Sequence, residues 1–286
     1  MALTKTGLLV AALLYTVVAP IATTLQGQEL KSMHTVSIEA RNVAWELRVN
    51  DIPVLSSDDD ASMQMSGYPI SVWLITGRNT VSVRILKVEH STTDPMDPKY
   101  CKVVVSGPKG EATTAPVLAQ VEAKPAPKSG ADLSSSREAS FSATLKHPNP
   151  AWATSAKIGK DAATQQLILD KFREFHGLLT KKDLNGVMQF SAAKFKEYEQ
   201  ALGDPTFGAS QKTSFQEQFA SAGKLLGIDV QAKNGLRFEY YAGDRLISIN
   251  NDENRSIIQY YDSSDGTTTQ YVLYFYFDGK GFVLIR

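Results

Sequence analysis

Apolar and polar residues alternate along the first third of the chain. The alternation is clearest in five short segments, which are residues 36–40, 43–49, 70–74, 81–85 and 100–105. A period of two places one face of a β-strand on a core and the other toward solvent. Gly77-Arg78-Asn79 separates two of the segments, and we expect it to form a hairpin loop. The pattern predicts an antiparallel β-sandwich domain over residues 30–105.

The composition changes after this domain. Residues 106–137 are rich in proline, alanine and serine, and include Lys124-Pro125-Ala126-Pro127. Such a stretch buries little apolar surface, so we predict a linker there. Apolar residues nevertheless alternate from Val117 to Ala123, which indicates a weak strand. Residues 117–146 would then complete the sandwich.

From residue 160 the apolar period changes to that of an α-helix. One helical face is formed by Ile168, Phe172, Phe175 and Leu179, and its helix should begin near Asp161. Asp183 is placed to cap a second helix. A third helix should end around Gly203. Ser214 and Glu217 have the spacing of a capping box, which predicts the start of a fourth helix.

Strands follow the helices. Five are expected, at residues 236–241, 245–250, 256–261, 269–277 and 281–285, and Asp265-Gly266 and Asp278-Gly279 predict hairpin turns. Helices followed by a meander of strands indicate an α+β domain with a curved antiparallel sheet over residues 160–286.

Tyrosine is frequent in this last sheet. Along residues 271–277, alternation directs Val272, Tyr274 and Tyr276 to one face. Tyrosine is enriched at interfaces, where its ring can be buried while its hydroxyl contacts water. Tyr241, Tyr274 and Tyr276 are therefore candidates for binding a partner or a ligand. The alternative is a contact between these tyrosines and the first domain.

The N-terminus has the pattern of a secretory signal peptide. Lys5 precedes an apolar run from Gly7 to Ala22, and polar residues follow. The run is shorter than the roughly 20 residues of a spanning helix. We predict cleavage that removes residues 1–24 and leaves no membrane span; an uncleaved anchor is the alternative. A single cysteine, Cys101, allows no disulfide within the chain, which fits a bacterial periplasmic or secreted protein.

Composition narrows the classes of function. The 286 residues are 43% hydrophobic, enough for the cores of two domains. There are 30 Lys plus Arg and 30 Asp plus Glu. A net charge of zero argues against a nucleic-acid-binding protein, which needs a basic face.

The sequence lacks the standard motifs of catalysis. It contains no metalloprotease, nucleophile-elbow, P-loop or dinucleotide-binding motif. The four histidines have no metal-ligand spacing, and His176 is better explained as an ordinary helix residue than as a pocket acid or base. Asp58-Asp59-Asp60 is not a calcium loop, because Met63 stands where an EF-hand needs glycine. We therefore predict no catalytic residue, metal or cofactor.

Two segments resemble known families. Residues 49–54 and 68–83 are similar to the jelly-roll accessory and carbohydrate-binding modules of exported proteins, although Asp51 stands where these have glycine. That resemblance implies a binding or interaction module.

The second resemblance covers residues 160–286. Residues 172–190 and the closing segment 277–285 resemble the SnoaL-like, ketosteroid-isomerase-like superfamily, also called nuclear transport factor 2-like. Phe282 replaces its usual tryptophan. The resemblance implies a conical α+β barrel with a pocket, and active members place a carboxylate base there. No carboxylate of this chain is matched to that base.

Together these features predict an exported, non-enzymatic binding protein. One version is an immunity- or inhibitor-type protein that binds a toxin or hydrolase in the bacterial periplasm. Two alternatives are open. One is a small-molecule enzyme, such as an isomerase, dehydratase or hydrolase, that uses the C-terminal pocket. The other is envelope carbohydrate binding on Trp45, Tyr68 or Trp73, although we expect Trp45 to be buried.

Overall fold

The fold is described from a computed structural model. The structure describes residues 33–57, 62–87, 98–110, 112, 114–125, 135–221, 223–226, 235–251, 256–262 and 267–286. The predicted signal peptide of residues 1–24, the acidic run Asp58-Asp59-Asp60 and the predicted turn at Asp265-Gly266 lie outside these residues.

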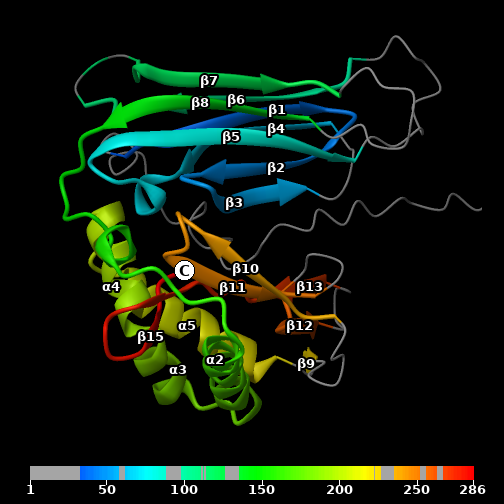
Figure 1. The fold of residues 1–286 in the computed structure, drawn as a ribbon, viewed down its shortest axis with the longest axis vertical. Helices are drawn as coiled ribbons and strands as arrows, with labels where there is room; N and C mark the ends of the chain where they lie inside the picture. The colour runs from blue at the N-terminus through cyan, green and yellow to red at the C-terminus, as the bar shows by residue number, and fades with distance from the viewer. Residues whose placement is uncertain are drawn as a thin grey trace, which may run out of the picture.

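The N-terminal half forms two four-stranded antiparallel sheets (Figure 1), with strand orders β4-β1-β6-β7 and β3-β2-β5-β8. Their strands are β1 (Thr35–Arg41), β2 (Ala44–Val49), β3 (Ile52–Ser57), β4 (Met63–Pro69), β5 (Gly77–Lys87), β6 (Tyr100–Ser106), β7 (Val117–Ala123) and β8 (Ser136–Ala143). Every paired strand is antiparallel to its neighbour. The predicted antiparallel β-structure is therefore present.

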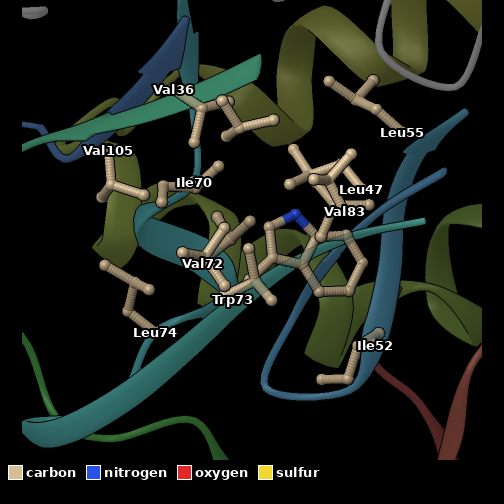
Figure 2. Close-up of a cluster of buried hydrophobic side chains, with 14 of the residues drawn as sticks. Val36, Leu47, Ile52, Leu55, Ile70, Val72, Trp73, Leu74, Val83 and Val105 are labelled. Atoms are coloured by element: carbon tan, nitrogen blue, oxygen red, sulfur yellow. The ribbon is translucent and has the colours of Figure 1, made fainter. Parts of the chain in front are cut away.

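The alternating residues fill the space between these sheets. Val36 and Val105 from one sheet share a hydrophobic cluster with Leu47 and Val83 from the other (Figure 2). All four are fully buried. Trp45, 1% exposed, lies in the same cluster, so its predicted burial is confirmed.

The prediction of a strand at residues 70–74 is wrong. A short 3-10 helix, η2 (Ser71–Trp73), occupies this position, while Ile70, Val72 and Leu74 are buried as expected (Figure 2). An alternating pattern shows which residues are buried but not which backbone conformation buries them. A single 3-10 turn can bury the same residues as a strand.

The predicted hairpin loop at Gly77-Arg78-Asn79 is also wrong. These residues begin β5 and pair with β8. The side chain of Asn79 accepts a hydrogen bond from the Ile75 N–H at 2.9 Å and donates one to the Ile75 carbonyl at 2.8 Å. The polar residue thus closes the turn that precedes the strand.

The predicted linker, residues 106–137, contains the whole of β7 and the start of β8. β7 pairs with β6 from Val117 to Ala123, which confirms the strand expected at residues 117–123. Strand formation is explained by burial of alternate side chains, with Ala123 fully covered. This strand forms the edge of its sheet.

Four α-helices follow, namely α2 (Ala162–Thr180), α3 (Leu184–Phe190), α4 (Ala192–Leu202) and α5 (Phe207–Ala220). The carboxylate of Asp161 accepts a hydrogen bond from the Thr164 N–H, and Asp183 caps α3 in the same way. Gly203 ends α4 in the left-handed region at φ +68°, which glycine adopts without strain. These three predicted boundaries are confirmed.

The start predicted for the fourth helix is wrong, because α5 begins at Phe207 and Ser214 lies inside it. The Ser214 hydroxyl donates to the carbonyl of Ser210 at 3.2 Å. A serine three residues before a glutamate also arises within a helix, where this bond to the preceding turn satisfies the hydroxyl.

The C-terminal strands form two antiparallel sheets, with orders β10-β11-β14-β15 and β13-β12-β9. They are β9 (Lys224–Leu226), β10 (Arg237–Tyr241), β11 (Leu246–Asn250), β12 (Gln259–Asp262), β13 (Thr267–Gln270), β14 (Phe275–Phe277) and β15 (Phe282–Leu284). β9 was not predicted. The predicted turn at Asp278-Gly279 is present, since the Asp278 carboxylate accepts from the Lys280 and Gly281 N–H groups.

Residues 269–277 do not form the single strand that was predicted. The chain leaves one sheet after β13 and enters the other at β14, so residues 271–274 connect two sheets. The predicted division of side chains still holds. Tyr271 and Phe275 pack in a second hydrophobic cluster beneath α2, whereas Tyr274 packs in the first cluster.

The first cluster extends through both halves of the chain. It continues from the N-terminal sheets into α4, α5 and β10 through Tyr198, Phe207 and Tyr241. Figure 1 shows these elements below the strands β2 and β3. The hydrophobic core is thus continuous where the two halves meet. No helix in the described part of the chain is long and apolar enough to cross a membrane.

Candidate functional site

A cavity of about 70 Å³ lies where the two halves of the chain meet. The N-terminal half lines it from β2, β3, β4 and η2, and the C-terminal half from α4, β10, β11 and residues 270–274, together with Arg286. Typical pockets for drug-sized ligands have volumes of about 300–1,000 Å³. This cavity has room for a group of only a few heavy atoms.

Aromatic rings form one side of the cavity. The ring of Tyr274 meets Trp73 edge-on, with centroids 6.0 Å apart, and Tyr241 edge-on at 5.4 Å. The Tyr274 hydroxyl donates to the carbonyl of Pro53 at 3.2 Å. The guanidinium of Arg48 lies 5.6 Å from the centre of the Tyr241 ring. These contacts give the cavity a rigid apolar wall built from both halves.

Two carboxylates of the cavity wall are paired within the protein. Glu46 is buried and accepts a hydrogen bond of 2.6 Å from Nε of Arg48. Glu239 accepts hydrogen bonds from Nδ2 of Asn250, at 2.9 Å, and from the Tyr241 hydroxyl. Burial raises the pKa of Tyr241, and Tyr274 and this bond to Glu239 add to the rise. Tyr241 therefore stays a hydrogen-bond donor.

Arg286 is 3% exposed and held from several sides. Its Nη1 donates to Oε2 of Glu197 at 3.1 Å, and its Nη2 donates to the carbonyl of Val72. The guanidinium carbon lies 4.9 Å from the centre of the Trp73 ring and 5.2 Å from that of Tyr198. Its buried Nε has no hydrogen-bond acceptor among the described residues.

Lys194 differs from the other charged residues of the cavity. It is 7% exposed and lies in the first turn of α4, with Nζ 5.9 Å from the centre of the Tyr198 ring. No hydrogen bond or ion pair joins its Nζ to another residue of the described ranges. Burial lowers the pKa of Lys194 to about 7, and repulsion by Arg286 contributes.

The structure separates the three tyrosines predicted as binding residues. Tyr241 and Tyr274 line the cavity together. Tyr276 instead lines a second hollow of about 340 Å³, with Lys196 and Glu197 among its neighbours. Arg286 borders both spaces.

The aromatic residues considered for sugar stacking also lie in different places. Tyr68 and Trp73 line the cavity from the N-terminal side, whereas Trp45 is inside the core. Cys101 is fully buried, and burial raises the pKa of its thiol to about 12. In the part of the chain that the structure describes, no group of three His, Cys, Asp or Glu residues is arranged to hold a metal ion.

The sequence reasoning missed Lys194, although a signal was present. Phe195, Tyr198 and Leu202 were recognised as the apolar face of the third helix, and Lys194 lies one turn before Tyr198 on that face. A lysine on a buried helical face is unusual, because lysine is almost never fully buried unless it is paired. Arg286 and Glu46 carried no comparable local signal.

Comparison with known proteins gave no relative. No protein-family model, curated protein or solved structure matches this chain. The site is therefore interpreted from its own geometry and chemistry.

Proposed function

We propose that this protein is a non-enzymatic binding protein that holds a small organic anion in the cavity, with the anionic group beside Lys194. The observation that supports this most strongly is the Lys194 side chain, which belongs to a residue only 7% exposed and which no described carboxylate neutralises. Each of the other charged cavity residues has a partner of opposite charge.

The charge balance supports an anion as the ligand. Glu46 pairs with Arg48, Glu239 with Arg237, and Arg286 with Glu197. An unpaired buried ammonium is unfavourable by several kcal/mol, and the group either loses its proton or acquires a counter-ion. A bound carboxylate would supply that counter-ion.

The shape of the cavity indicates the size of the ligand. The rings of Trp73, Tyr241 and Tyr274 suit a short apolar body rather than a second charge. A cavity needs about 10–15 Å³ to hold one water molecule, so a cavity of about 70 Å³ accepts a carboxylate with a very short chain. Acetate, propanoate and butanoate are the appropriate probes.

Calorimetric titration with these three carboxylates at pH 6, where Lys194 is charged, tests the proposal. We expect binding by the wild-type protein and at least a tenfold (about 1.4 kcal/mol) loss of affinity in Lys194→Met. Lys212→Met is the matched control, because Lys212 is exposed on α5. Equal affinity in the two variants, or no binding by the wild type, would refute the proposal.

Export to a bacterial periplasm belongs to the same proposal and is supported by the N-terminal sequence pattern alone. A protein partner, such as a toxin or hydrolase, is the second candidate. The exposed large hydrophobic residues among those described are Val117, Leu167 and Tyr261, which lie on three different elements. A docking surface needs a contiguous patch, so a small ligand is better supported.

A further inference from the structure

We propose that the amine of Lys194 also forms a Schiff base with small aldehydes or ketones that enter the cavity. This inference rests on the cavity of the proposed function, but it does not require that an anion binds there. It assigns a covalent chemistry to a site with no standard catalytic motif.

The surroundings of Lys194 are those that make an amine nucleophilic. A lysine becomes reactive when it is desolvated in an apolar pocket or lies near another cation. Lys194 is 7% exposed, and Arg286 repels its charged form. Its place in the first turn of α4 adds the positive end of the helix dipole, which also disfavours the ammonium.

The neutral amine is consequently abundant near pH 7. With the pKa of Lys194 at about 7, about half of the molecules carry an uncharged amine at that pH. An exposed lysine, with a pKa of about 10.4, is uncharged in fewer than about one molecule in a thousand. The cavity thus raises the fraction of reactive amine at this position about a thousandfold.

The reaction needs no oxidant or reductant. The lone pair of Nζ attacks the carbonyl carbon and forms the C–N bond, while the carbonyl oxygen gains a proton and the nitrogen loses one. In the resulting carbinolamine the nitrogen loses its second proton and the hydroxyl gains one. The C–O bond then breaks, so that water leaves and the C=N bond of the imine forms. Amine and carbonyl compound thus give imine and one water.

Tyr198 is placed to assist the loss of water. Its ring centre lies 5.9 Å from Nζ of Lys194, and it lines the same cavity. Burial raises the pKa of the Tyr198 hydroxyl, so that the hydroxyl keeps its proton and can donate a hydrogen bond to the departing oxygen.

Reductive trapping on the full-length wild-type protein tests the inference without a variant. The protein is incubated with acetone and cyanoborohydride at pH 7, and the extent of modification at each lysine is measured by peptide mass spectrometry. The hydride fixes the imine as a stable isopropyl-lysine. We expect Lys194 to react at least tenfold faster than the exposed Lys212.

Equal or slower reaction at Lys194 would overturn the inference. A second measurement separates this from the proposed function. Carboxylate binding at pH 6 without selective trapping would leave the proposed function in place and refute the Schiff base. Selective trapping without carboxylate binding would support the Schiff base and refute the proposed function. Tyr198→Phe should slow trapping at Lys194 and leave the rate at Lys212 unchanged.

Discussion

The hydroxyl of Tyr274 donates a hydrogen bond to the carbonyl of Pro53, a residue that lies 221 positions earlier in the chain, at a distance of 3.2 Å. The bond joins the C-terminal half to β3 beside the cavity. Since Tyr274 also contacts Trp73 and Tyr241, this residue connects the two halves through both a polar and an aromatic contact.

Removing the Tyr274 hydroxyl should destabilise the protein without disturbing the aromatic wall. We expect Tyr274→Phe to lower the free energy of unfolding by about 1 kcal/mol, the usual contribution of one such hydrogen bond. The measurement is equilibrium unfolding in urea. Tyr261→Phe is the control, because Tyr261 is 37% exposed on β12. Equal stability of the two variants would contradict the role assigned to Tyr274.

The buried face of α2 should dominate the stability of the C-terminal cluster. Phe172 is fully buried, and its ring centre lies 5.5 Å from that of Phe275. Phe172→Ala should lower the free energy of unfolding by about 3–5 kcal/mol, through lost burial and the cavity left behind. Leu167→Ala, at a position 58% exposed on the same helix, should change it by less than about 0.5 kcal/mol.

The ion pair of Arg286 should matter more than a surface pair. Glu197 accepts hydrogen bonds from Arg286 and from the Ala151 N–H, and the Arg286 side chain is 2% exposed. Glu197→Ala should lower the free energy of unfolding by about 3 kcal/mol, because it leaves a buried charge unpaired.

The pair between Asp170 and Arg173 provides the comparison. It spans 2.9 Å, but both side chains are well exposed. Asp170→Ala should therefore change the free energy of unfolding by no more than about 0.5 kcal/mol. If Glu197→Ala lowered the free energy of unfolding by no more than Asp170→Ala does, Arg286 would not be held as the structure indicates.

The parts of the fold that depend on local interactions were predictable. The apolar face of α2 was read from the spacing of Phe172 and Phe175, because a helix that covers one core has a regular period. Asp183 was recognised as a helix cap because the bond it makes spans only three residues. Trp45 was placed correctly in the core by alternation.

The cavity was not predictable, because no local pattern encodes it. Its walls come from segments as distant in sequence as Glu46 and Arg286. Alternation placed Tyr274 on one face of its strand, but nothing in the sequence showed that Tyr241 faces the same space. Residues 70–74 show a second limit, since their apolar period correctly reported burial but did not distinguish a 3-10 turn from a strand.

Lys194 should make stability depend on pH in a defined direction. Its pKa falls from about 10.5 in the unfolded chain to about 7 in the native protein. The unfolded state therefore binds more protons between these values, and stability should rise as pH increases from about 7 to about 10.5. Below pH 7 the full penalty of the buried ammonium is present.

The difference between the wild type and Lys194→Met isolates this effect, because Glu46, Glu239 and Arg286 are present in both proteins. At pH 6, Lys194→Met should be the more stable by an amount on the order of 5 kcal/mol, since a pKa change of one corresponds to about 1.4 kcal/mol. The difference should vanish near pH 10.5. Urea unfolding at several pH values measures it, and a difference that is constant with pH would contradict the assignment.

The most direct test of the account is the number of protons taken up when acetate binds. Calorimetry in HEPES and in Tris, whose ionisation enthalpies differ, gives this number. If the anion holds Lys194 in its charged form, the wild-type protein should take up about 0.9 proton per acetate at pH 8 and about 0.1 at pH 6. Binding by the wild type with no proton uptake at pH 8 would show that Lys194 is not the group that meets the anion.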